Sequence, residues 1–230
     1  MADLATSSTF DFLKAEKRLT PPRGVVIAKS FEEALEFWKQ PEVRIVVVGG
    51  SDKIPEDVAA ALSKTFIGEQ AKTSLLVTDK LPPERLGTNI AKQLLDYDFA
   101  QDDPAMFAKT CALFTKAANF FAQIRSIEGS SDPAVLMMGH NWPYNPGPHR
   151  DQRCTMAYTL QGITTMTFAD SDIANLDSPG RIVQLKQNAQ PYFVDLCSFA
   201  AIKAGAPHGT PWIKGWKAPV GFARVSGVFN

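Results

Sequence analysis

The sequence predicts an α+β fold with a mixed α/β region at residues 1–130 and a β-rich region at residues 131–230. In the first region, β-branched runs alternate with stretches of helical periodicity. In the second region, short strand-like runs follow one another between glycine, proline, asparagine and aspartate residues. Strands of this length and density are typical of a β-sandwich or a barrel-like jelly roll.

As far as residue 78, the first region contains a lead-in, three expected strands and two expected helices. In order, they are a lead-in at 1–23, a strand at 24–28, a helix running through Trp38, a strand at 44–48, a helix at 54–66 and a strand at 74–78. Ser30 and Glu33 have the spacing of a capping box, which predicts where the first helix begins. Gly49-Gly50 lacks the spacing of a P-loop or a dinucleotide-binding loop, so it predicts a turn that ends the strand.

A longer helix is expected from Asp103 to about Arg125, since aspartate is a good N-cap and Pro104 suits the first helical position. Apolar side chains recur along it at three- and four-residue spacings. They are Phe107, Cys111, Phe114, Ala118 and Phe121. We expect this stripe to be buried, with the helix packed on the outside of the sheet of the second region.

Seven short strands are expected in the second region. They are at 134–138, 154–160, 164–168, 181–185, 192–196, 200–204 and 222–229. No internal repeat or low-complexity segment interrupts them. The pattern therefore predicts a β core with the first region as an α/β extension.

The composition is that of an ordinary globular protein. Of the 230 residues, 45% are hydrophobic and 21% are charged, and the formal net charge is zero, so no basic field favours nucleic acid. The three cysteines lack CxxC spacing, which argues against a disulfide framework. No apolar run approaches the ~20 residues of a membrane span, and the N-terminus lacks a signal-peptide core. A soluble cytoplasmic protein with a small-molecule substrate is expected, and its oligomeric state stays open.

A candidate metal site comes from two of the three histidines. His149-Arg150-Asp151 is an HxD motif, and residues i and i+2 of a strand point to the same face. One short strand can therefore offer an imidazole and a carboxylate to a single ion. His208 lies far downstream, after the turn at 205–207, and a returning strand can bring it to the same ion. Two histidines and one carboxylate are the usual ligand set of non-haem iron(II) oxygenases.

A candidate anion site follows sixteen residues after His208, at Arg224-Val225-Ser226. Arg224 and Ser226 again share a strand face. A guanidinium can bind a carboxylate through two parallel hydrogen bonds, and the serine hydroxyl adds a third donor. This pair could hold the distal carboxylate of a keto acid whose other end chelates the iron.

The ordered set His149-x-Asp151, His208 and Arg224-x-Ser226 resembles the pattern of the iron(II)/2-oxoglutarate-dependent oxygenase superfamily, over about residues 134–230. The resemblance implies a double-stranded β-helix (jelly-roll or cupin-like) core, iron(II) held by the triad, and 2-oxoglutarate held by Arg224 and Ser226. It also implies an enzyme that uses dioxygen and 2-oxoglutarate to hydroxylate, desaturate or cyclise a small organic substrate.

Further candidates flank the HxD strand. Tyr144 and Asn145 immediately precede it and are candidates for the cofactor pocket. Arg153, two residues beyond Asp151, either binds a substrate carboxylate or faces solvent.

Two other functions remain open from the sequence. The first is an iron oxidase of the same fold that does not use 2-oxoglutarate, in which Arg224 holds the carboxylate of the substrate itself. The second is a cupin-like metal-binding module without redox activity. Asp151 argues against this module, since non-redox cupins more often use several histidines and a glutamate, and the chain has only three histidines.

Overall fold

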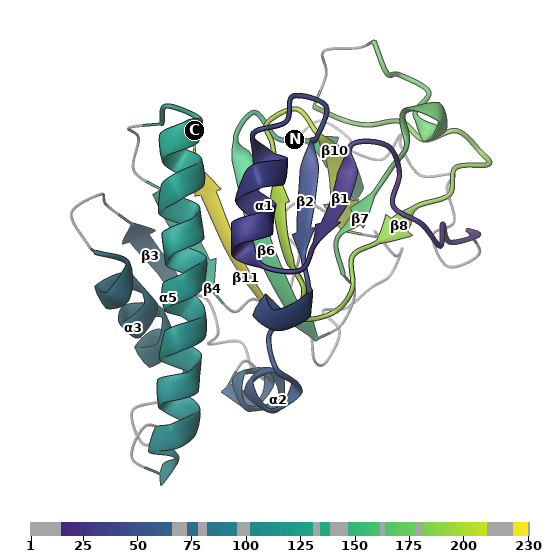
Figure 1. Cartoon of the computed structure of the whole chain (residues 1–230). Coiled ribbons are helices and arrows are strands. Elements are labelled where there is room, and N and C mark those ends of the chain that lie inside the picture. Colours follow the sequence, from purple (N-terminus) through teal and green to yellow (C-terminus); the bar gives the residue numbers. More distant parts are fainter. Residues whose placement is uncertain are drawn as a thin grey trace, which may run out of the picture.

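The computed structural model describes residues 15–65, 73–77, 82–95, 102–130, 134–138, 147–161, 164–177, 181–210 and 223–229 (Figure 1). Within these ranges the helices are α1 (Phe31–Trp38), α2 (Glu56–Thr65), α3 (Pro83–Leu94) and α5 (Pro104–Ile127), with two short 3-10 turns, η1 (Gly50–Asp52) and η2 (Asp170–Asp172). None of these helices is long and apolar enough to cross a membrane.

The strands form two sheets. The larger sheet has seven strands in the order β1-β2-β9-β6-β11-β4-β3, and the smaller has four in the order β5-β10-β7-β8. The bounds are β1 (Val25–Ala28), β2 (Ile45–Val48), β3 (Thr73–Val77), β4 (Ala134–Met138), β5 (Gly147–Arg150), β6 (Cys154–Gln161), β7 (Met166–Thr167), β8 (Tyr192–Phe193), β9 (Phe199–Ile202), β10 (Pro207–Thr210) and β11 (Ala223–Phe229). The structure is a mixed α/β fold with two sheets, and neither sheet closes into a barrel within the described ranges.

The predicted N-caps of α1 and α5 both form, although the capping box of α1 is incomplete. The Ser30 hydroxyl accepts from the backbone N–H of Glu33, but Glu33 bonds the backbone N–H of Lys29, so only half of the expected capping box forms. The Asp103 carboxylate accepts from the backbone N–H of Met106 at 2.9 Å, as an N-cap should.

Two elements differ from the predictions. Helix α3 was not expected, although Pro83 at its start is a helix-start signal. The strand expected at 181–185 is reduced to isolated bridges at Ile182 and Leu185. Ile182 pairs with His149, and Leu185 pairs with Ile173. Whether such pairing continues along a segment depends on the partner strand, so the local sequence pattern did not show that this strand would be so short.

The main apolar core lies between the large sheet and the helices. In Figure 1, α3 and α5 lie at the end of the large sheet that holds β3 and β4, and β7 and β8 lie on the opposite side of the picture. Of the predicted stripe on α5, Phe114 and Phe121 are buried and Phe107 is partly buried against the same core. Phe114 meets Tyr158 of β6 edge to face, with the ring centroids 6.1 Å apart.

The two faces of the large sheet belong to different clusters. Tyr158 of β6 and Phe199 of β9 face the helices, whereas Ala200 and Ile202 of β9 form a second cluster with Val194 and Ala206. A third cluster, which includes Met166 and Phe168, lies on the small sheet. Successive side chains of a strand point to opposite faces of the sheet. One face of the large sheet therefore packs against the helices, and its other face contributes apolar side chains to a second layer on the side of the small sheet.

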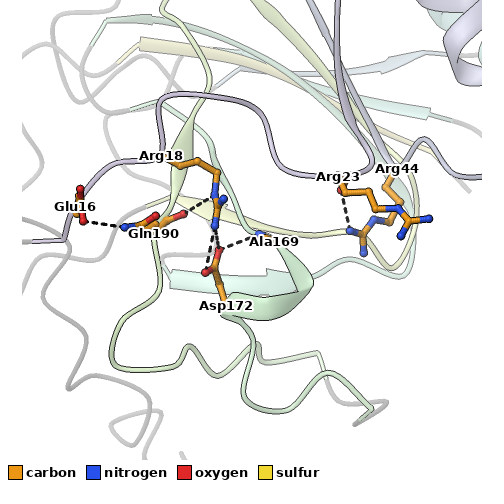
Figure 2. A network of polar contacts seen from close by, with 7 residues as sticks. All are labelled: Glu16, Arg18, Arg23, Arg44, Ala169, Asp172 and Gln190. Carbon is orange, nitrogen blue, oxygen red and sulfur yellow. Dashed lines mark hydrogen bonds and ion pairs between the residues drawn. The ribbon is translucent and has the colours of Figure 1, made fainter.

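Residues 16–18 of the lead-in attach to the small-sheet side of the molecule (Figure 2). The backbone N–H of Arg18 donates to the carbonyl of Pro191, and its guanidinium pairs with the buried Asp172 at 3.2 Å. The Gln190 amide donates to Glu16, which adds a second attachment point. These contacts place residues 16–18 next to β8, the edge strand of the small sheet within the described residues.

Both predicted regions contribute to the large sheet. Strands β1, β2 and β3 come from residues 1–130, and β9 pairs directly with β2 through the register Ile45↔Ile202. The division of the chain at residue 130 stays a prediction.

Candidate metal centre

The two histidines of the predicted triad lie opposite each other on neighbouring strands. His149 of β5 and His208 of β10 are direct partners in the antiparallel register. Residues paired in this way project to the same face, and the two imidazole ring centroids are 4.6 Å apart. Strand pairing therefore brings together two side chains that are 59 positions apart in the sequence (208 − 149).

Each imidazole is oriented by a backbone carbonyl two residues before it. Nδ1 of His149 lies 2.9 Å from the carbonyl oxygen of Gly147, and Nδ1 of His208 lies 2.9 Å from that of Ala206. A carbonyl oxygen only accepts, so each Nδ1 carries the hydrogen and donates it. In the neutral imidazole, Nε2 then keeps a free lone pair, which is the arrangement that metal-binding histidines use.

The carboxylate of Asp151 completes the cluster. Its Oδ1 lies 3.7 Å from Nε2 of His149, and its Oδ2 lies 3.4 Å from Nε2 of His208. Asp151 comes one residue after the end of β5, and its backbone is held because the N–H of Gly205 donates to its carbonyl at 2.8 Å. One ligand atom from each of the three residues lies within 4.8 Å of the others, so a single ion can contact all three.

Two donors contact the carboxylate of Asp151 from different parts of the fold. The hydroxyl of Thr155, buried in β6 of the large sheet, donates to Oδ2 at 2.9 Å. Nη2 of Arg181, from the segment beside β5, lies 3.5 Å from Oδ1. The sequence analysis missed both residues, because neither has a motif or a spacing that relates it to the HxD triplet.

The surroundings set the protonation states that a metal requires. Burial, assisted by the charge of His208, lowers the pKa of His149 from its usual 6.5 to about 4. Burial alone would raise the pKa of Asp151, but the neighbouring imidazole of His208, that of His149 and the Thr155 hydroxyl hold it well below its usual range. At neutral pH, His149 is therefore neutral and Asp151 ionised, as ligands of a divalent cation must be.

Glycine allows the two histidine strands to approach each other. Gly209 follows His208 and lies against the backbone of Gly147 and Pro148, where an added Cβ would overlap the carbonyl oxygen of Gly147. That oxygen is the acceptor that orients His149. Gly147 itself has a φ of +88°, in the left-handed region that favours glycine. A side chain at position 209 would thus separate the strands and disturb an imidazole at the same time.

The other predicted site residues divide into three groups. Arg224 and Ser226 lie in β11 of the large sheet, with their backbones paired to Thr159 and Ala157 of β6. Tyr144 and Asn145 lie outside the described residues. Arg153 is exposed, two residues after Asp151.

Comparisons with known proteins add little to this geometry. No family model matches the sequence, and no curated protein matches it. One solved structure, described as "Crystal Structure of FeII HppE", is 11% identical, with a TM-score of 0.24. The likeness covers 43% of this chain and 42% of that one, so the chain matches less than half of that protein's length. A likeness this weak supports no argument about fold or chemistry, and the site must be interpreted from its own residues.

Proposed function

We propose that the chain is a non-haem iron(II) oxygenase in which His149, Asp151 and His208 hold the iron. The observation that carries the proposal is the convergence of two Nε2 atoms and one carboxylate, with both Nδ1 atoms engaged by carbonyls. Two imidazoles and one carboxylate are the donor set that suits iron(II) and leaves coordination positions open. When bound, the iron would supply the chemistry of dioxygen activation at those positions.

The strand connectivity supports a double-stranded β-helix around the site. From β4 onward, the chain runs through the large sheet at β4, β6, β9 and β11 and through the small sheet at β5, β7, β8 and β10. Repeated crossing between two facing antiparallel sheets is how a jelly roll is built. In this arrangement the triad projects from the small sheet, and Thr155 reaches it from the large sheet. The front strands β1, β2 and β3 then extend the large sheet at its two ends.

The register of β11 supports 2-oxoglutarate as the co-substrate. Thr155, Ala157 and Thr159 are alternate residues of β6, and Thr155 bonds Asp151. Arg224 is paired with Thr159, and Ser226 with Ala157, so both register positions belong to the β6 face that serves the site. We propose that Arg224 and Ser226 bind the distal carboxylate of 2-oxoglutarate, with Tyr144 and Asn145 as further contacts. The product class is hydroxylation, desaturation or cyclisation of a small organic substrate.

Metal binding is tested first, because everything else depends on it. The purified protein should bind one iron(II) under anaerobic conditions. His149→Ala and His208→Ala should each lose most of the affinity, since each removes one of three ligands. His140→Ala is the matched control, because His140 is the remaining histidine and has no metal role in the proposal. Unchanged iron stoichiometry in both triad variants would exclude this site.

The co-substrate is tested next, by adding 2-oxoglutarate to the anaerobic iron(II) protein and recording the visible spectrum. A charge-transfer band is expected. Arg224→Ala should weaken 2-oxoglutarate binding by roughly 30- to several-thousand-fold, because removing one partner of a buried charge pair costs about 2–5 kcal/mol. Arg224→Lys should restore part of the affinity, since lysine keeps the charge but lacks the planar fork. No band, together with turnover on iron and dioxygen alone, would favour the 2-oxoglutarate-independent oxidase.

A further inference from the structure

Arg181 is the cation that lies against the candidate metal ligand Asp151. Its Nη2 is 3.5 Å from Oδ1, beyond the 2.7–3.2 Å of a good N–H···O bond. The Arg181 side chain is 58% exposed, whereas Asp151 is 18% exposed. The contact is therefore long and reaches from the solvent side, in contrast to the buried hydroxyl of Thr155 on the other oxygen.

The backbone around Arg181 is fixed against the histidine strand. The N–H of Arg150 donates to the carbonyl of Arg181 at 2.8 Å, and the N–H of Val183 donates to that of Pro148 at 3.1 Å. Ile182 forms an isolated bridge with His149. The segment thus runs along the edge of β5 that β10 leaves open, and it holds the base of the arginine beside the site.

Metal binding changes the electrostatics that Arg181 experiences. An iron(II) ion of charge +2 bound to one carboxylate of charge −1 and neutral imidazoles leaves a net charge of about +1 at the centre. The guanidinium, which is always protonated, then faces a positive site instead of a lone carboxylate. In the iron-loaded protein, the attraction between Arg181 and Asp151 would therefore be weaker. The planar guanidinium of Arg181 could then bind a different anion through its paired N–H donors.

Two exposed apolar side chains belong to the segments around Arg181. Ile182 is 45% exposed and Leu176 is 43% exposed, and both are large side chains. Arg150 contacts the segments that carry both side chains. Its guanidinium donates to the carbonyl of Leu176, and its backbone N–H donates to the carbonyl of Arg181, next to Ile182. A bidentate donor next to exposed aliphatic side chains matches a ligand that has one acidic group and an apolar body.

We propose that Arg181 is a specificity-determining residue that binds the acidic group of the primary substrate, a small organic acid with an aliphatic body. The proposal rests on the iron site of the proposed function and names the class of substrate for that site. It assigns Arg181 to the substrate, whereas Arg224 serves the co-substrate.

The test uses three probes of equal size and different charge on the anaerobic iron(II) protein. Hexanoate, hexan-1-ol and hexylamine are titrated by calorimetry, with and without 2-oxoglutarate. Hexanoate should bind at least tenfold more tightly than the other two. Arg181→Gln should remove this preference and weaken hexanoate at least tenfold, and Arg181→Lys should keep part of it. An equal affinity for the acid and the alcohol in the wild type, or an unchanged hexanoate affinity in Arg181→Gln, would overturn the proposal.

Three controls separate this role from its rivals. Arg153→Gln, which changes an exposed arginine near the same ligand, should leave hexanoate binding unchanged. Arg181→Gln should bind iron at least as tightly as the wild type, because a competing cation has been removed; a loss of iron would instead assign Arg181 to holding Asp151. A drop in 2-oxoglutarate affinity as large as that of Arg224→Ala would assign Arg181 to the co-substrate. Failure of the proposed function has a separate signature, which is a wild-type protein that binds no iron.

Discussion

The two faces of β6 are equally buried but serve different purposes. Met156 and Tyr158 face the helices and belong to the main apolar core. Thr155 and Thr159 alternate with them and are also buried, and the hydroxyl of Thr155 reaches the candidate metal ligand Asp151. Successive side chains of a strand point to opposite faces, so one short segment contributes both to the core and to the candidate site. Burial by itself therefore does not separate structural from functional positions here; the chemical type of the buried side chain does.

The largest expected effect comes from the helix-facing side. Phe120 of α5 is buried between Phe31 and Phe199, with ring centroids 5.0 and 5.6 Å away. Phe120→Ala should lower the free energy of unfolding by about 3–5 kcal/mol, since it removes an aromatic ring and leaves a cavity. Denaturant unfolding measures the loss. Iron affinity of the folded variant should stay within about twofold of the wild type, and a tenfold decrease would mean that the two faces are coupled.

The next-largest expected effect is a loss of folding stability at low pH, caused by His149 on the side of the candidate metal site. The pKa of His149 is about 4 in the folded state against 6.5 as its ordinary value, so the unfolded chain binds the proton more readily. The metal-free protein should lose stability as the pH falls from 6.5 to about 4, by about 3 kcal/mol in total. The pKa of Asp151 is lowered from 3.8, so its contribution stays nearly constant over this window. Unfolding in the presence of a chelator, at several pH values, measures the slope.

His149→Gln is the control for this slope. The variant lacks the titrating imidazole. Its unfolding should therefore take up about one proton fewer between pH 6.5 and 4, and its free energy of unfolding should change less with pH. Parallel profiles for the two proteins would show that His149 is not the group responsible.

An intermediate effect is expected from Thr155, on the site face of β6. Thr155→Val keeps the shape of the side chain but removes the donor to Asp151. Partners that orient metal ligands typically contribute 10–100-fold to affinity, so iron binding should weaken by roughly that factor. Thr155→Ser retains the hydroxyl and should recover most of the affinity. A competition titration with a chelator of known iron affinity measures both variants, and wild-type affinity in Thr155→Val would remove the positioning role.

The smallest effect is expected on the opposite face of the same strand. The hydroxyl of Tyr158 is buried and has no hydrogen-bond partner among the described residues, and burial raises its pKa. Tyr158→Phe removes an unsatisfied polar group, so the free energy of unfolding should rise by about 1 kcal/mol while iron binding is unchanged. Thermal unfolding detects this change. Together with Thr155→Val, it tests whether removing one hydroxyl from each face of β6 has opposite consequences.

Much of the helical side could be predicted locally. The N-caps of α1 and α5 and the buried stripe on α5 depend on residues within a few positions of one another, which is why sequence periodicity reveals them. The candidate metal ligands His149 and Asp151 could also be identified locally, because they belong to one HxD triplet. Thr155 and Arg181 had no such signal. Thr155 comes from a strand of the other sheet, and Arg181 comes from a segment thirty residues after Asp151 (181 − 151).

The sequence by itself determined the chemistry and the local periodicity: which side chains can ligate, cap or pack, and which ones share a face. Only the tertiary structure decided that β5 pairs with β10, that Gly209 permits their close approach, and that β2 joins β9 across the two predicted regions. The physical reason is that the cost of closing a loop rises only slowly with its length, so the chain does not encode locally which distant strand becomes the partner. That choice depends on burying one face of each strand at the correct register, and this is a property of the whole folded chain.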